Sequence, residues 1–366
     1  MRKLLFICML IIFICVNLSA QLTVSGVLDS TVSLNAGAGN APEFSYGVEE
    51  FANIRFQSKL RDNGAVYGAV NLIAASGDYA RNLEGTGISI GGDNFAAAIE
   101  LERLYFRLSG EYTNFDFGLM RIPFGFGQVW GSSDFLNPRN PLKPDARPRA
   151  VLSAVFSWYP VDEIKLLLFL ASSRDALANE GDGSLAGLSF DKHWDKASVQ
   201  ALYSFETPKA GSDLGIHRAG LSVKADVEAG LYIDALYTYN HQAETRLDGL
   251  SFSAGADYSF LDGNLIILAE YLYNGENSST AFDLEKNPLG LPSRHCLYAG
   301  LTFRFNDFTN LSAALIFSYD NISYTPVLTF NHELFQGASL VITAQAPFDN
   351  DSFYGVFCAA KVRLRF

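Results

Sequence analysis

The chain has 366 residues, of which 49% are hydrophobic and only 18% are charged, and its formal net charge is −12. An acidic chain is a poor partner for nucleic acid, and so small a charged fraction is low for a large soluble domain. Beyond residue 20 no apolar run reaches the length of a transmembrane helix, yet short amphipathic segments recur throughout. That combination is typical of a membrane β-barrel.

A secretory signal peptide is predicted at residues 1–20. Two basic residues follow the initial Met, and residues 4–16 are almost entirely apolar, with small residues before a cleavage site at Gln21. Because this apolar run is shorter than the roughly 18 residues that a spanning helix needs, the pattern favours a cleaved signal over a membrane anchor. Leu18 is larger than usual at its position, which leaves the exact cleavage site open.

The remaining chain, residues 21–366, is predicted to be one domain of successive strands, because short turns and longer connections alternate along it. The eight short turns lie at residues 62–64, 111–114, 160–162, 194–196, 226–228, 261–264, 306–307 and 336–337. The nine longer connections lie at residues 36–45, 77–97, 125–148, 172–183, 208–215, 241–247, 274–293, 320–322 and 346–352. This order predicts an all-β, antiparallel, up-and-down transmembrane barrel of about 18 strands, with short periplasmic turns and longer external loops. Pro326 weakens one strand, so a barrel of 16 strands remains the alternative.

Alternation within each strand assigns side chains to lipid or to the lumen. The deeper inward basic residues are Arg55, Arg103, Arg149 and Arg218, and the clear inward acids are Glu206, Asp234, Asp257 and Glu270. All eight are candidate pore-lining residues. Further inward Lys and Arg residues crowd the strand ends near the turns. The excess of basic over acidic inward residues therefore indicates either a rim at the turns or a filter across the lumen.

Residues 121–149 depart from the strand pattern. They begin Arg-Ile-Pro-Phe-Gly and continue into a stretch rich in Asp and Asn-Pro steps. This resembles a segment of porin-like bacterial outer-membrane channels, in which an Arg-x-Pro-aromatic-Gly strand end precedes an Asn-Pro-rich loop. Asn140 stands where such loops often carry Asp, so a role for that carboxylate is not carried over.

Residues 127–148 contain four prolines, which restrict the backbone, and a long rigid loop usually has a function. We expect this loop to fold into the lumen and narrow it. The side chains that it would present there are Asp134, Arg139, Asp145 and Arg147. A stiff external cap or a latch between subunits is the alternative.

The last segment alternates strictly and ends on Phe366. A terminal aromatic residue that closes an alternating strand resembles the signal by which bacterial outer-membrane barrels are recognised for assembly. The resemblance implies export through the periplasm, the barrel-assembly machinery as a partner, and outer-membrane lipid as the surroundings.

No enzyme activity and no cofactor are expected. The five histidines are scattered, and neither a metal-ligand spacing nor a nucleophile motif is present. Barrels of 16–18 strands leave an aqueous lumen, so the sequence predicts passive diffusion of small hydrophilic solutes, with a mild preference for anions. The alternative is a surface adhesin or structural protein that uses acidic external loops. The solute and the oligomeric state stay open.

Overall fold

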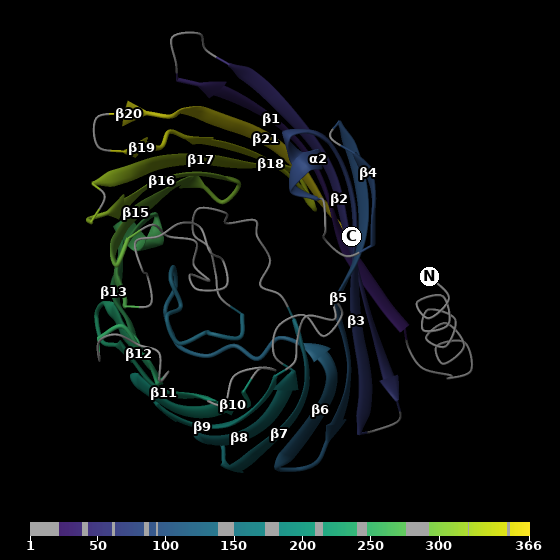
Figure 1. Cartoon of the computed structure of the whole chain (residues 1–366), viewed down its shortest axis with the longest axis vertical. Coiled ribbons are helices and arrows are strands. Elements are labelled where there is room, and N and C mark those ends of the chain that lie inside the picture. Colours follow the sequence, from purple (N-terminus) through teal and green to yellow (C-terminus); the bar gives the residue numbers. More distant parts are fainter. Residues whose placement is uncertain are drawn as a thin grey trace.

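The computed structural model covers residues 1–366 and describes residues 22–38, 43–60, 63–83, 88–92, 94–137, 150–172, 183–208, 215–239, 247–275, 293–320, 322–349 and 352–366. Across these residues a single antiparallel sheet curls round and closes on itself (Figure 1). None of the helices found there is long and apolar enough to cross a membrane.

Eighteen strands form the ring, which confirms the predicted antiparallel barrel with the larger of the two strand numbers. They are β1 (Leu22–Gly37), β2 (Phe44–Leu60), β3 (Gly64–Gly77), β5 (Phe95–Ser109), β6 (Thr113–Met120), β7 (Val151–Val161), β8 (Ile164–Ser172), β9 (Ser184–Trp194), β10 (Ala197–Glu206), β11 (Ile216–Asp226), β12 (Gly230–Tyr239), β13 (Leu250–Phe260), β14 (Leu265–Asn274), β15 (His295–Asn306), β16 (Thr309–Ser318), β17 (Ser323–Phe335), β18 (Ala338–Gln345) and β21 (Gly355–Arg365). Each pairs with the next, and β21 pairs with β1. Closure removes the unpaired edges that an open sheet would expose.

The seam between β1 and β21 is fixed by an ion pair on the inner face. Asp29 lies directly opposite Arg363 in the register. The guanidinium donates to both carboxylate oxygens, from Nε at 2.8 Å and from Nη2 at 2.7 Å. This two-point geometry is the strong form of the Arg–carboxylate contact, so it holds the first and last strands of the ring in register.

Short elements outside the ring occupy two of the predicted longer connections. Between β3 and β5 the chain forms α2 (Asp78–Asn82) and β4 (Ile88–Gly92), and β4 pairs with β5 from Phe95 to Ile99. Between β18 and β21 it forms β19 (Phe348–Asp349) and β20 (Ser352–Phe353). A single 3-10 turn, η1 (Leu261–Gly263), joins β13 to β14.

Pro326 is accommodated within β17 by the way its neighbours pair. From Val327 onward β17 pairs with β18, while Ser323 and Tyr324 pair with β19. Pro326 therefore falls in the interval between these two partners. A proline has no backbone N–H, so a strand can contain a proline in such an interval without losing a ladder bond.

The outward side chains form an apolar surface around the ring. On β8, for example, Leu168 is 56% exposed and Leu170 is 61% exposed. Exposed aromatic side chains lie near strand ends, among them Trp158, Trp194 and Tyr239. An apolar band flanked by aromatic residues is the outer surface expected of a barrel in a membrane.

Candidate functional site

Residues 121–137, here called the inner segment, lie inside the ring (Figure 1). The chain leaves the wall after Met120, at the end of β6, and forms neither helix nor strand until the described part ends at Asn137. The second half of the predicted lumen loop falls outside the described residues. Three predicted loop residues, Arg139, Asp145 and Arg147, lie in that half, and the predicted pore-lining residue Arg149 also falls outside the described residues.

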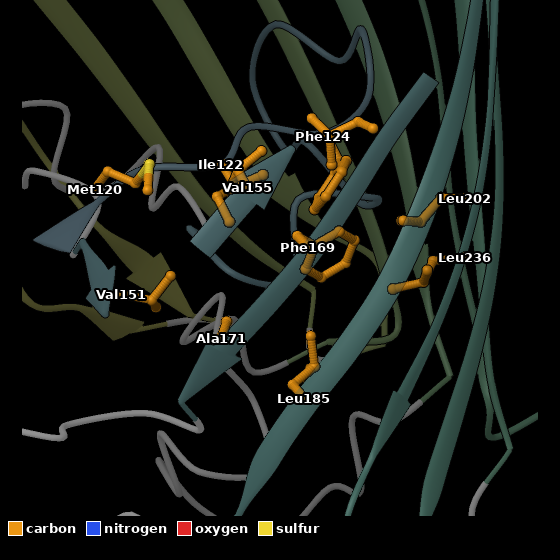
Figure 2. Close-up of a cluster of buried hydrophobic side chains, with 11 residues drawn as sticks. Met120, Ile122, Phe124, Val151, Val155, Phe169, Ala171, Leu185, Leu202 and Leu236 are labelled. Atoms are coloured by element: carbon orange, nitrogen blue, oxygen red, sulfur yellow. The ribbon is translucent and has the colours of Figure 1, made fainter. Parts of the chain in front are cut away.

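The first part of the inner segment covers an apolar stripe on the inner wall. Ile122 and Phe124 are both 4% exposed and belong to a cluster with inward side chains of β7, β8, β9, β10 and β12 (Figure 2). The ring of Phe124 stacks on Phe135 of the same segment, with centroids 5.8 Å apart, and meets Phe169 of β8 at 5.4 Å.

The sequence of β8 indicates this apolar inner stripe, although assigning faces by alternation alone did not reveal it. β8 is apolar on both faces, since Leu168 and Leu170 point outward while Leu167 and Phe169 are buried inside. An inner wall in contact with water is polar. Two-sided apolarity in one strand therefore indicates that something covers the inner face at that point.

Asp234 of β12 binds the backbone of the inner segment just after Phe124. It is 0% exposed. Its Oδ2 accepts the N–H of Gly127 at 2.7 Å, and its Oδ1 accepts the N–H of Phe126 at 2.9 Å. Gly125 makes this approach feasible: it has a φ of +82°, and a Cβ there would lie 2.5 Å from Asp234 Oδ2. Only glycine combines that backbone conformation with that clearance.

Glu270 of β14 binds the next turn of the segment. It is 1% exposed. Its Oε2 accepts the N–H groups of Gln128 at 3.1 Å and of Val129 at 2.8 Å, and its Oε1 accepts the N–H of Trp130 at 3.1 Å. Five consecutive backbone amides, residues 126–130, thus bond to two wall carboxylates. The Gln128 side chain also donates to Asp257 of β13, from Nε2 to Oδ2 at 2.6 Å.

Trp130 anchors the far end of this stretch. Its indole is 0% exposed and packs in a cluster with Leu272, Cys296 and Ile316 of β14, β15 and β16. The ring N–H donates to the backbone carbonyl of Glu270 at 3.2 Å. Burial of a complete tryptophan whose N–H is satisfied is among the larger stabilising contributions that a single side chain makes.

Asp234 and Glu270 therefore face inward but do not line open lumen, which corrects their prediction as pore-lining residues. The prediction that Asp134 is presented to the lumen was also wrong. Asp134 is 4% exposed, and its Oδ1 accepts the N–H of Asn137 at 3.2 Å. Asn137 in turn accepts the N–H of Ile122 at 3.0 Å. These bonds tie the two ends of the inner segment together, so the Asp134 side chain stabilises the local backbone instead of facing the lumen.

Arg218 and Glu206 form an ion pair beside the inner segment, with Nη1 and Oε2 2.8 Å apart. The Arg218 guanidinium also lies 4.9 Å from the ring centroid of Phe135, within the range of a cation–π contact. The two predicted residues thus meet and neutralise one another, and little of either side chain is exposed.

β2, β5 and the inner segment each contribute one arginine to a cluster. Glu102 Oε1 is 2.8 Å from Arg103 Nη2 and 3.0 Å from Arg121 Nη2, so one carboxylate serves two guanidiniums. Arg55 of β2 donates from Nε to the side-chain oxygen of Asn53 at 2.6 Å. All three guanidiniums thus meet acceptors on the inner wall, and the carboxylate of Asp134 lies close enough to interact with Arg121 as well.

A β-bulge explains why Glu102 and Arg103 face inward although they are neighbours in sequence. Ala69 of β3 pairs with Arg103 and Val70 pairs with Leu101, so Glu102 is the extra residue. Bulges redirect side chains in this way. Strict alternation assigned Arg103 to the lumen and left Glu102 without a role, so it missed the carboxylate that pairs with Arg103.

Beside these arginines lies a small cavity of about 170 Å³, with Tyr67 and Tyr105 in its lining. The two rings stack with centroids 4.9 Å apart. Arg107 lies 5.6 Å and 5.8 Å from these centroids and binds both carboxylate oxygens of Asp116. The remaining lining residues are Thr23, Ser25, Arg55, Phe56, Gln57, Gly68 and Arg103.

The inner wall carries more acids than the alternation indicated. Asp29, Glu102, Asp116 and Asp191 are all buried and each pairs with a basic side chain. The expectation of a predominantly basic wall is therefore too simple. Within the part of the chain that is described, no group of three His, Cys, Asp or Glu side chains could hold a metal ion.

Neither a protein-family model nor a curated protein matches the sequence. Solved structures match in fold. OccAB4 from Acinetobacter baumannii superposes with a TM-score of 0.60 at 11% identity, over 94% of this chain and 99% of that one. OccK8 (OprE) from Pseudomonas aeruginosa gives 0.59 at 11%, over 94% and 98%. A triple mutant of Rh. blastica porin gives 0.51 at 12%, over 94% and 100%.

At these identities the comparisons establish the fold. The chain has the porin fold, a closed antiparallel β-barrel. A closed barrel with an apolar outer surface is a form in which strands can span a membrane.

Proposed function

We propose that this protein is a passive outer-membrane channel for small hydrophilic solutes. The observation that carries the proposal is the asymmetry of the inner wall. The inner segment packs on β7–β10 and β12–β16, while the side chains of Arg55 and Arg103 on β2 and β5 remain at least partly exposed inside the barrel. A ring of 16–18 strands is wide enough to keep water beside such a wall. The inner segment is then the constriction of the channel.

A modest anion preference follows from the charges around Glu102. Arg103 and Arg121 share this one carboxylate, and Arg55 bonds to a neutral amide. Arg55 is exposed and Arg103 is partly exposed inside the barrel, whereas the nearby Glu102 and Asp134 are buried, so the charge that a solute meets on that side is positive. Fixed charges on a pore wall favour counter-ions, over about 8–10 Å at physiological ionic strength. The paired acids elsewhere on the wall keep the preference small.

Single-channel recording of the purified protein in planar bilayers tests the proposal. We expect stable, uniform conductance steps, and a reversal potential under a salt gradient whose sign shows anion preference. A folded barrel that conducts no ions would contradict the channel and would favour the surface adhesin. Cation selectivity would contradict the role given to the arginines while leaving the channel intact.

Phe366 is proposed as the assembly signal of the barrel. Its backbone extends the seam, since its N–H donates to Gly26 O at 3.1 Å and its carbonyl accepts the Gly26 N–H at 2.8 Å. The ring covers Gly26, where a Cβ would collide with it, and is 61% exposed. We expect Phe366→Ser to reduce the heat-modifiable, folded fraction in outer membranes. Normal migration of that variant, compared with the outward control Leu364→Ser, would contradict the role.

A further inference from the structure

The outer wall of the barrel carries one acidic side chain at a position where lipid is expected. Across the described strands of the ring, Glu50 of β2 is the only Asp or Glu that faces outward, and it is exposed. Its Oε1 accepts the hydroxyl of Ser30 on β1 at 2.6 Å. A carboxylate on this face is unfavourable unless hydrogen-bond donors reach it. Glu50 therefore indicates that this part of the wall meets a specific neighbour.

The strands around Glu50 supply no positive charge to that face. In the described parts of β1, β2, β3, β5 and β21, every Lys and Arg occupies an inward position. The Ser30 hydroxyl is the one donor that Glu50 receives from the described residues. A carboxylate has room for further hydrogen bonds, so the neighbour that fits this wall is one that brings a donor of its own.

Glu50 lies in a groove on the outer wall, with a volume of about 600 Å³. The groove follows a row of register partners that crosses six adjacent strands, namely β21, β1, β2, β3, β5 and β4. The row consists of Val362, Ser30, Glu50, Ala74, Ala97 and Ile90. Ser30 and Ala74 flank Glu50 directly, and their small side chains leave space on both sides of it.

The next outward row forms one side of the groove. It consists of Leu364, Leu28, Ala52, Leu72 and Ile99, which are also register partners. Leu28 is 42% exposed and Ile99 is 52% exposed. Apart from Glu50 and Ser30, the outward side chains that line the groove are apolar. The groove thus combines an apolar surface with one hydrogen-bonding point near its middle.

The dimensions of the groove fit a hydrocarbon chain. Six strands span five spacings of about 4.8 Å, which gives a row about 24 Å long. Because barrel strands tilt by about 35–45°, such a row covers about 14–17 Å of membrane depth, which is one leaflet of a hydrocarbon core about 30 Å thick. A spanning helix, about 10–12 Å wide and about 30 Å long, is several times larger than this volume.

We propose that the groove binds one lipid hydrocarbon chain that carries a hydroxyl group, and that this hydroxyl donates to Glu50. The apolar rows remove the chain from contact with other lipids, and the hydroxyl supplies the donor that the carboxylate requires once it is covered. A plain chain would cover Glu50 without adding a donor, so the site discriminates between the two. The site lies on the outer wall and does not depend on the proposed channel function.

Native mass spectrometry of the purified, delipidated barrel tests the proposal with two neutral probes. Glyceryl mono-12-hydroxystearate and glyceryl monostearate differ by one hydroxyl near the middle of the chain, as Glu50 lies near the middle of its row. We expect one hydroxylated molecule per barrel, bound at least about fivefold more tightly than the plain one. Equal affinities for the two probes would overturn the role of Glu50.

Two variants locate the site. Glu50→Leu should remove the preference and still bind both probes, and Ala74→Phe should fill the groove and abolish binding of both. Ala299→Phe is the matched control, because it enlarges an outward alanine on β15, away from the groove. Heat-modifiable migration on gels verifies that each variant is folded. Equal binding in Ala74→Phe and Ala299→Phe would overturn the location. Dimers that bind no probe and dissociate in Ala74→Phe would overturn the lipid site in favour of a contact between copies.

Discussion

On β12 and β14, Asp234 and Glu270 are buried beneath the inner segment and bond to its amides, whereas on β2 and β5 Arg55 and Arg103 stay partly exposed inside the barrel. Both sets occupy inward positions of alternating strands. The difference lies in what covers them. A charged inward residue under a folded segment contributes to structure, and one on an open wall is available to a passing solute. The inward direction of a side chain in a barrel thus does not by itself define a pore lining.

The largest effect is expected on the covered side, from Trp130→Ala. Removing a fully buried indole costs about 3–5 kcal/mol, which here weakens the attachment of the inner segment. Amide hydrogen exchange of residues 126–130 measures the loss. Trp158→Ala is the control, because that side chain is outward and 45% exposed. Slow exchange retained in Trp130→Ala would show that the carboxylates alone hold the segment.

Gly125→Ala should have the next largest effect. The residue has a φ of +82°, and the added Cβ would lie 2.5 Å from Asp234 Oδ2. Strain of this kind costs on the order of 1–3 kcal/mol, and it should fall on the amide bonds of Phe126 and Gly127. Their exchange rates report it. Gly92→Ala is the matched control, since a Cβ there meets nothing within 4 Å. Equal exchange in the two variants would contradict the close approach.

A smaller effect is expected on the open side, where water screens the charges. Replacing both Arg55 and Arg103 with Gln should move the reversal potential under a salt gradient toward zero. The shift should be only a fraction of the potential that an ideally anion-selective channel would show. Lys192→Gln removes a positive charge on the outward face, where its ammonium lies 5.7 Å from the Trp194 ring centroid, and should leave the potential unchanged. An equal shift in that control would mean that overall charge, rather than the lumen wall, sets selectivity.

Glu102→Gln should change the anion preference in the opposite direction, because it removes a negative charge from the same wall. Because Glu102 pairs with both Arg103 and Arg121, its neutralisation removes the carboxylate that the two guanidiniums share. Anion preference should therefore increase, by less than the arginine variants reduce it, since screening limits each charge. A decrease would show that this carboxylate chiefly orients the arginines.

The sequence by itself determined the barrel. Alternation has a period of two, and the order of short and long connections sets the topology, so both can be read locally. Arg103, Arg107 and Arg218 could be assigned to the inner face in this way. The same reasoning found residues 121–149 by their prolines and glycines, and it placed the start of the lumen loop within a few residues of the point where β6 ends.

Only the tertiary structure decided which inward charges are covered. The bond from Gly127 to Asp234 spans 107 residues, and the bonds from Trp130 to Glu270 span 140. Their donors are backbone amides, which every residue except proline possesses, so no side-chain pattern marks them. The bulge that turns Glu102 inward is likewise a product of register between strands. Local periodicity selects the face of a strand, and long-range packing decides whether that face meets water.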